Sequence, residues 1–85
     1  MADERIAAPI RTFLSRSFSG KTFRDEDDIF ALGFANSLFA MQLVSFVERE
    51  FGIEITSEDL EMENFCSIRA ISGLVERKLE APVNN

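Results

Sequence analysis

The segment from Ser37 to Phe51 constrains the fold more than any other part of the chain. Its apolar residues recur at three- and four-residue spacing, which is the pattern of a helix with one buried face. Gly52 follows directly, and glycine is the residue that most often ends a helix in a left-handed conformation. We therefore expect a helix over 37–51 whose apolar stripe is covered by other helices. The stripe consists of Leu43, Val44, Phe46, Val47 and Phe51.

Helical spacing also appears near both ends of the chain. The first predicted helix begins at Asp3 or Pro9 and ends at Phe18. Its regular part is expected to start near Ala8, because a proline deep inside a helix costs about 3 kcal/mol. A last helix is expected over Ser67 to Leu79. The apolar positions behind these two predictions are Ile6, Ile10, Phe13, Leu14, Ile68, Ile71, Leu74, Val75 and Leu79.

The connecting segments are expected to contribute to the core as well. A short third helix is predicted around Ser57 to Glu61, where Thr56 or Ser57 is suited to cap its start. The "IEI" segment before it is interpreted as a buried extended linker. The connection from Ser19 to Ala35 is long for a small domain, so its own side chains must anchor it. Those side chains are Ile29, Phe30, Leu32 and Phe34.

Together these elements predict an all-α fold. We expect a small antiparallel bundle of three main helices plus one short helix, with a long loop between the first and second helices. A chain of 85 residues is enough for one domain. Residues 1–85 are therefore interpreted as a single domain, with an ordered core over about 4–80 and a tail over 81–85.

Composition disfavours several classes of function. The chain has 9 Lys and Arg against 15 Asp and Glu, a formal charge of −6, which disfavours nucleic acid and favours a protein partner with a basic patch. It has no histidine and one cysteine, so neither a zinc site nor an internal disulfide is expected. Its N-terminus is not a secretory signal, and no apolar run is long enough to span a membrane. We expect a cytoplasmic monomer.

The sequence contains no constellation of catalytic residues, so we do not expect an enzyme. Ser37 has no histidine to activate it. The acidic run from Asp25 to Asp28 lacks the spacing of a calcium loop and is interpreted as a solvated surface. Cys66 is interpreted as a small half-buried residue beside Phe65 rather than as a reactive thiol.

Two interpretations of Ser37 compete. Serine and asparagine are both preferred at the N-cap of a helix, so Ser37 or Asn36 caps the helix over 37–51. A helix start also stabilises an anion through its free N–H groups and its dipole. An exposed serine at this point therefore suits a phosphodiester-linked group attached by another enzyme, although position alone favours capping.

The order of motifs across nearly the whole chain resembles the acyl carrier protein family. The resemblance lies in "DDIFALGFANSLFAMQLVSFVEREFGIEI" and "ENFCSIRAISGLVER". In that family a leucine and a glycine precede an Asp-Ser-Leu motif, and the long helix that follows ends in a Phe-Gly-Ile pattern. The counterparts in this chain include Leu32, Gly33, Ser37, Leu38, Phe51, Gly52, Ile53, Ile55, Phe65 and Ile68.

The resemblance implies that Ser37 carries 4′-phosphopantetheine, transferred from coenzyme A by a separate phosphopantetheinyl transferase that uses magnesium. The thiol of this arm would hold an acyl or aminoacyl group as a thioester. A tethered arm raises the concentration of its cargo at each docked enzyme. The other partners implied are a loading enzyme (an acyltransferase or an adenylating enzyme), an acyl-modifying dehydrogenase and a downstream synthase.

Two departures from the family's pattern bear on these partners. Asn36 stands where acyl carriers usually have an aspartate before the serine. The following helix keeps Glu48 but lacks other acids expected on its exposed side, and negative charge is placed instead at positions such as Glu58 and Asp59. All four of these residues are candidates for partner docking.

We expect docking to depend more on apolar contact than on charge. The apolar candidates are Leu38, Phe39 and Met41, all near Ser37 in the sequence. An equally weighted alternative is that Phe39 and Met41 face the core.

A narrower resemblance concerns the pathway. The segment "NSLFAMQLVSFVE" is similar to discrete carriers of polyketide and hybrid peptide–polyketide pathways, some of which carry hydroxymalonyl, methoxymalonyl or aminomalonyl extender units. The chain begins with Met1 and shows no linker to another domain, so we expect a discrete protein that acts in trans. The alternatives are a fatty-acid, aminoacyl or D-alanyl carrier, and a non-carrier interaction module in which Ser37 only caps a helix.

Overall fold

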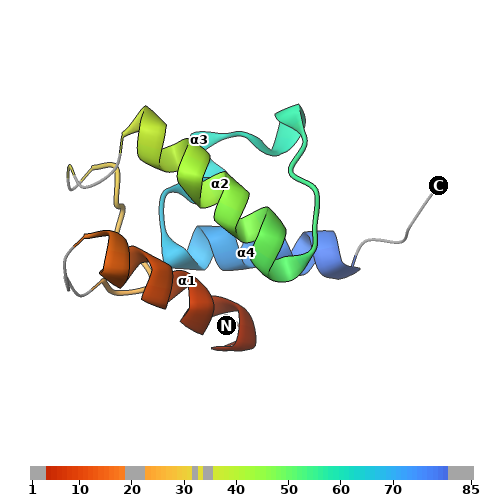
Figure 1. The fold of residues 1–85 in the computed structure, drawn as a ribbon, viewed down its shortest axis with the longest axis horizontal. Coiled ribbons are helices and arrows are strands. Elements are labelled where there is room, and N and C mark those ends of the chain that lie inside the picture. Colours follow the sequence, from red (N-terminus) through yellow and green to blue (C-terminus); the bar gives the residue numbers. More distant parts are fainter. Residues whose placement is uncertain (1–3, 19–22, 32, 34–35, 81–85) are drawn as a thin grey trace.

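The computed structural model describes residues 4–18, 23–31, 33 and 36–80 (Figure 1). The predicted anchors Leu32 and Phe34, a helix start at Asp3 and the tail over 81–85 lie outside these residues. The described part is all-α, as predicted. Its elements are α1 (Glu4–Ser17), α2 (Ser37–Phe51), the 3-10 turn η1 (Ser57–Asp59), α3 (Met62–Phe65) and α4 (Ile68–Glu80).

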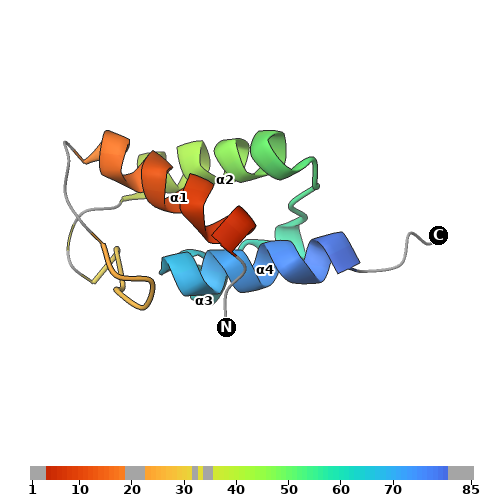
Figure 2. The same cartoon turned by 90° about the horizontal axis from the view of Figure 1, so that it is seen from below.

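The three longer helices enclose one apolar core. In the two perpendicular views α1 lies beside both α2 and α4, and α2 and α4 lie on opposite sides of the core (Figures 1 and 2). The apolar stripes predicted for the helices face one another there, except that Leu79 is 51% exposed and was wrongly assigned to the core. The residues that are completely buried include Ile10, Leu14, Ile29, Leu43, Val47, Ile68, Ile71 and Val75.

The bounds predicted for α2 are confirmed at both ends, because each end is set by a local cap. Asn36 has extended backbone, and its side-chain Oδ1 accepts a hydrogen bond from the N–H of Phe39 at 2.9 Å. Gly52 has φ 65°, in the left-handed region, and its N–H donates to the carbonyl of Glu48 at 2.9 Å. The cap is therefore Asn36 and not Ser37.

The predicted start of the first helix near Ala8 is wrong. α1 begins at Glu4 and continues through Pro9. Proline removes one backbone hydrogen bond from a helix, here the bond to the carbonyl of residue 5. Ile6 and Ala7 lie before the proline and are buried in the core, so tertiary packing holds the first turn helical.

The predicted short helix over Ser57 to Glu61 is also corrected, because the structure divides this region in two. Its first part is η1, and Thr56 precedes it as the N-cap. The Asp59 carboxylate accepts hydrogen bonds at 3.0 Å from the N–H and from the hydroxyl of Thr56. After an extended residue at Glu61 the chain forms α3. The "IEI" linker has no regular secondary structure, and it is buried only in part: Ile55 is buried, Ile53 is half-buried and Glu54 is exposed.

The acidic run is not simply a solvated surface, which corrects that interpretation. Asp25 forms an ion pair with Arg11 at 2.9 Å, and its backbone carbonyl accepts from the N–H of Arg69 at 2.8 Å. Asp28 accepts from the N–H groups of Phe30 and Ala31 at 3.0 and 2.9 Å. These contacts fix the loop against α1 and α4, and they hold Phe30 close to α2.

Candidate functional site

Ser37 is the first residue of α2 and is exposed. Since Asn36 supplies the cap, the helix does not need the Ser37 hydroxyl for its start. The N–H groups of the first turn of a helix have no helical partner, and the cap occupies that of Phe39, the one such bond found among the described residues. No acidic residue lies in the first turn of α2. The surroundings of Ser37 therefore favour a negatively charged group.

An apolar groove opens beside Ser37. It has a volume of about 450 Å³ and lies between the first half of α2, the segment 60–65 and Phe30. Glu61 is its one charged lining residue among those described. A group attached to Ser37 would therefore lie at the edge of an apolar surface. The full lining is Phe30, Asn36, Ser37, Ala40, Met41, Val44, Leu60, Glu61, Met62 and Phe65.

A side chain of α4 holds in place the wall of the groove that lies opposite α2. Lys78 Nζ lies 2.6 Å from Asp59 Oδ2, and both side chains are half-buried. The hydrogen bond from Lys78 lowers the pKa of Asp59, and those from Thr56 lower it further against the opposing effect of burial. The Asn64 side-chain amide donates to the carbonyl of Asp59 at 2.9 Å. These bonds fix the turn that leads into Leu60.

Two of the predicted docking acids have structural roles instead. Asp59 is engaged by Lys78 and Thr56, as described above. Glu48 is half-buried, and its Oε2 accepts from the N–H of Ile55 at 2.8 Å, which ties the linker to α2. We therefore remove both residues from the proposed docking surface, because their carboxylates are already used within the fold.

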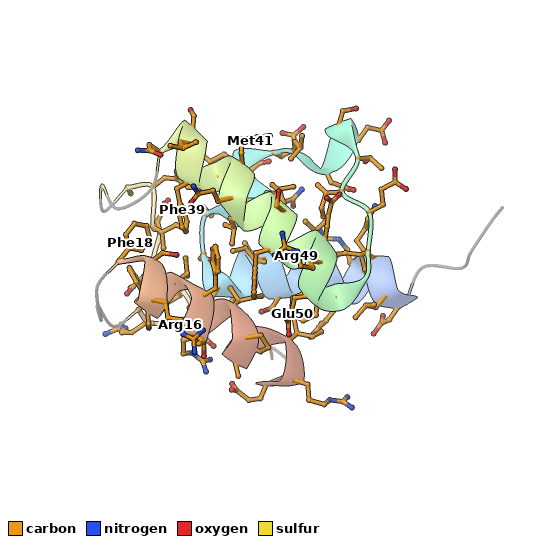
Figure 3. All side chains as sticks on the ribbon, viewed as in Figure 1. Arg16, Phe18, Phe39, Met41, Arg49 and Glu50 are labelled. Carbon is orange, nitrogen blue, oxygen red and sulfur yellow. The ribbon has the colours of Figure 1, made fainter. Side chains whose placement is uncertain are left out.

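Phe39 is also removed from the docking surface. Only 8% of it is exposed. Its ring lies 4.8 Å from that of Phe18 and 5.8 Å from that of Phe13, measured between centroids, and Figure 3 shows Phe18 and Phe39 side by side. The sequence contained the signal for this, since Phe39 precedes Leu43 by one helical turn and Val47 by two.

Met41, unlike Phe39, lies at the surface of the protein. It is 61% exposed, and Leu38 is 70% exposed. Asn36 and Glu58 are exposed too, although the Asn36 side chain is occupied by the cap. These four remain candidates for contact with a partner.

Sequence reasoning missed the contribution of the 60–65 segment to this site. Leu60 and Met62 are 49% and 66% exposed, although both are large and apolar. Phe65 is buried below them. The signal available in the sequence was a leucine and a methionine two residues apart in an otherwise acidic segment.

Further findings concern metals, thiols and membranes. Within the part of the chain that the structure describes, no three His, Cys, Asp or Glu side chains are grouped to hold a metal ion. Cys66 is half-buried and free, in agreement with its interpretation as a small packing residue. The described helices include none that is both long and apolar enough to span a bilayer.

Comparison with known proteins identifies the family. Residues 5–75 match the family described as "Phosphopantetheine attachment site". A search of the curated proteins finds no match. The matched residues include all of α1 but its first residue, all of α2 and most of α4, and with them the exposed serine and the groove described above. The chain therefore belongs to the phosphopantetheine-attachment family, whose domains are carriers to which 4′-phosphopantetheine is covalently joined.

Proposed function

We propose that Ser37 is the residue that carries 4′-phosphopantetheine, and that residues 1–85 act as one discrete acyl carrier domain. The observation that carries this proposal is the position of Ser37. It is exposed at the first residue of α2 and borders the apolar groove, within a chain whose family bears this group. The cap is made by Asn36, so the serine is free to be modified without loss of the helix start.

Electrostatics at the helix start support the same residue. A phosphodiester on Ser37 would be negatively charged, and the positive end of the α2 dipole would stabilise it. The first turn of α2 contains no acidic residue that would oppose this. Asn36 provides the cap without adding a negative charge beside the phosphate.

The carrier would work in trans with separate enzymes. A phosphopantetheinyl transferase would attach the arm from coenzyme A. A loading enzyme, an acyltransferase or an adenylating enzyme, would form the thioester, and an acyl-modifying dehydrogenase and a downstream synthase would act on it. The carrier itself supplies position and effective concentration rather than catalysis. We assign it to a polyketide or hybrid peptide–polyketide pathway on the resemblance of residues 36–48.

The chemistry of the cargo has two candidates. The resemblance favours an unusual extender unit such as a hydroxymalonyl, methoxymalonyl or aminomalonyl group. The groove favours an apolar acyl chain, since all but three of its lining residues are apolar and a charged malonyl group gains nothing by leaving water for it. A fatty-acid type of cargo is therefore the second candidate. The two differ in a measurable way, because a long apolar thioester would be shielded from nucleophiles and a malonyl thioester would not.

A non-carrier interaction module is the rival function. Intact mass separates the two: the chain is incubated with coenzyme A, magnesium and a broad-specificity phosphopantetheinyl transferase, beside Ser37→Ala. We expect the wild-type chain to gain one phosphopantetheine and the variant none. The variant should remain folded, because Asn36 still caps α2. A folded wild-type chain that gains no mass would favour the interaction module.

A further inference from the structure

Both methionines that the structure describes lie at the rim of the groove. Met41 is on α2, one helical turn beyond Ser37 and therefore on the same side of the helix (Figure 3). Met62 begins α3 and lines the opposite wall. The two side chains are 61% and 66% exposed. Two elements that are distant in the sequence thus place a thioether on each side of one apolar groove.

This part of the surface gathers large apolar side chains that water can reach. In the described part of the chain five such side chains are exposed, and three of them, Met41, Leu60 and Met62, line the groove. A contiguous apolar surface marks a place where another molecule binds. Leucine matches methionine in helix propensity and is close to it in apolar volume. The property that only the two methionines add to the groove is the chemistry of sulfur.

Hydrogen peroxide oxidises a thioether without help from an enzyme. The sulfur lone pair attacks one peroxide oxygen, so that an S–O bond forms as the O–O bond breaks. The proton of the transferred oxygen passes to the departing hydroxide, which leaves as water. The sulfur loses the two electrons that the peroxide gains. The product is methionine sulfoxide, which is polar and is converted back to methionine by methionine sulfoxide reductases.

Such a reaction would change the character of the groove. Both methionines are open to solvent, so the peroxide reaches them in the folded protein. The groove has one charged lining residue among those described, Glu61, and its walls are otherwise mainly apolar. A sulfoxide on each wall adds two strong dipoles at its rim. An apolar chain that enters must then strip water from both oxygens, which costs free energy.

We propose that Met41 and Met62 form a site of reversible oxidation that controls the groove. With both methionines reduced the groove holds an apolar chain, and with both as sulfoxides it releases that chain to water. The consequence for an acyl cargo rests on the proposed function of Ser37. The change in the groove itself does not depend on that function, so the two are tested separately.

The first test measures the groove in the chain that carries no arm. The probe is N-phenyl-1-naphthylamine, a neutral apolar fluorophore, titrated before and after treatment with peroxide that is then destroyed by catalase. Tandem mass spectrometry verifies a sulfoxide at both positions. We expect Kd for the probe to rise on the order of tenfold. Methionine sulfoxide reductases for both sulfoxide epimers should restore the original Kd.

The control is the double variant Met41→Leu with Met62→Leu, whose groove stays apolar and nearly unchanged in volume. It keeps Met1, which lies outside the described residues, and the half-buried thiol of Cys66, so oxidation elsewhere in the chain still occurs. Its Kd should stay within about twofold of the untreated wild type, with or without peroxide. Each single variant should show part of the rise. Oxidised wild type should melt within about 5 °C of the reduced chain.

The second test measures the cargo. Chains with reduced or oxidised methionines are loaded by a phosphopantetheinyl transferase from octanoyl-coenzyme A, and hydroxylamine is added to cleave the thioester. If the reduced groove shelters about nine-tenths of the acyl chains, a tenfold loss of affinity leaves about half sheltered, and cleavage is roughly fivefold faster. The double variant should show no such change after peroxide treatment.

The outcomes separate this inference from the proposed function. A wild-type chain with both sulfoxides that binds the probe as before would overturn the inference, and so would a double variant that loses as much affinity as the wild type. A reduced chain that does not bind the probe, or an oxidised chain that unfolds, would also contradict it. If the probe behaves as expected and no octanoyl group can be loaded, the assignment of Ser37 is wrong and the oxidation site remains.

Discussion

Replacing Phe39 with alanine tests the assignment of this residue to the core. The substitution empties a site where the side chain is only 8% exposed and lies against the rings of Phe13 and Phe18. Phe→Ala at buried sites costs about 3 to 5 kcal/mol. Phe39 lies in the first turn of α2 and is slightly exposed, so neighbouring groups can partly fill the cavity. We therefore expect a loss of about 3 to 4 kcal/mol in the free energy of unfolding. A domain of 85 residues has a total stability of roughly 4 to 13 kcal/mol.

The assay is thermal unfolding followed by circular dichroism, with Leu38→Ala as the control. For a domain of this size a loss of 3 to 4 kcal/mol lowers Tm by roughly 15 to 25 °C. Leu38 is the adjacent residue and is 70% exposed, so its replacement should change stability by no more than about 0.5 kcal/mol. A Phe39→Ala variant that melts within about 5 °C of wild type while losing transfer from its partners would refute the burial and restore Phe39 as a docking residue.

Three further substitutions test the local structure that positions the site, each by chemical denaturation. Gly52→Ala should cost about 1 kcal/mol through backbone strain alone, since φ is 65° and no atom lies within 4 Å of the added Cβ; an unchanged stability would contradict the left-handed cap. Asn36→Ala should lower the free energy of unfolding by about 1 kcal/mol, and Ser37→Ala should lower it by less. If Ser37→Ala were the more destabilising of the two, Ser37 would be the cap. Asp59→Asn should cost about 1 kcal/mol near neutral pH. The pKa of Asp59 is lowered by folding, so its contribution is present above the ordinary value of 3.8 and is lost as pH falls below it. If the free energies of unfolding of wild type and Asp59→Asn differ as much at a pH well below 3.8 as they do near neutral pH, the Lys78 pair is not the source of the difference.

The features that the sequence predicted correctly are those set by local chemistry. Asn36 and Gly52 determine the ends of α2 through hydrogen bonds that span three or four residues, so the sequence predicted both ends, although it left open whether Asn36 or Ser37 caps the start. Ser67 acts similarly at the start of α4, where its hydroxyl accepts from the N–H of Ala70 at 3.0 Å. Helices with clear stripes and good caps are predictable for this reason.

The errors arose where contacts distant in the sequence decide the outcome. Asp59 looked like a surface acid, and its pairing with Lys78 depends on how α4 returns to the η1 turn. Pro9 suggested a late helix start, and the burial of Ile6 and Ala7 overrode it. The groove could not be predicted either, because its walls come from α2, the 60–65 segment and Phe30, which only the fold brings together.

The central claim is that Ser37 carries the phosphopantetheine arm, and peptide mapping by tandem mass spectrometry tests it most directly. The chain is modified with coenzyme A and a phosphopantetheinyl transferase, digested, and fragmented to locate the added group. Ser57 serves as the control, because it is also exposed and also begins a helical element. The account predicts that the group lies on Ser37, that Ser37→Ala abolishes it and that Ser57→Ala leaves it unchanged. A group found on another serine, or one retained in folded Ser37→Ala, would contradict the account.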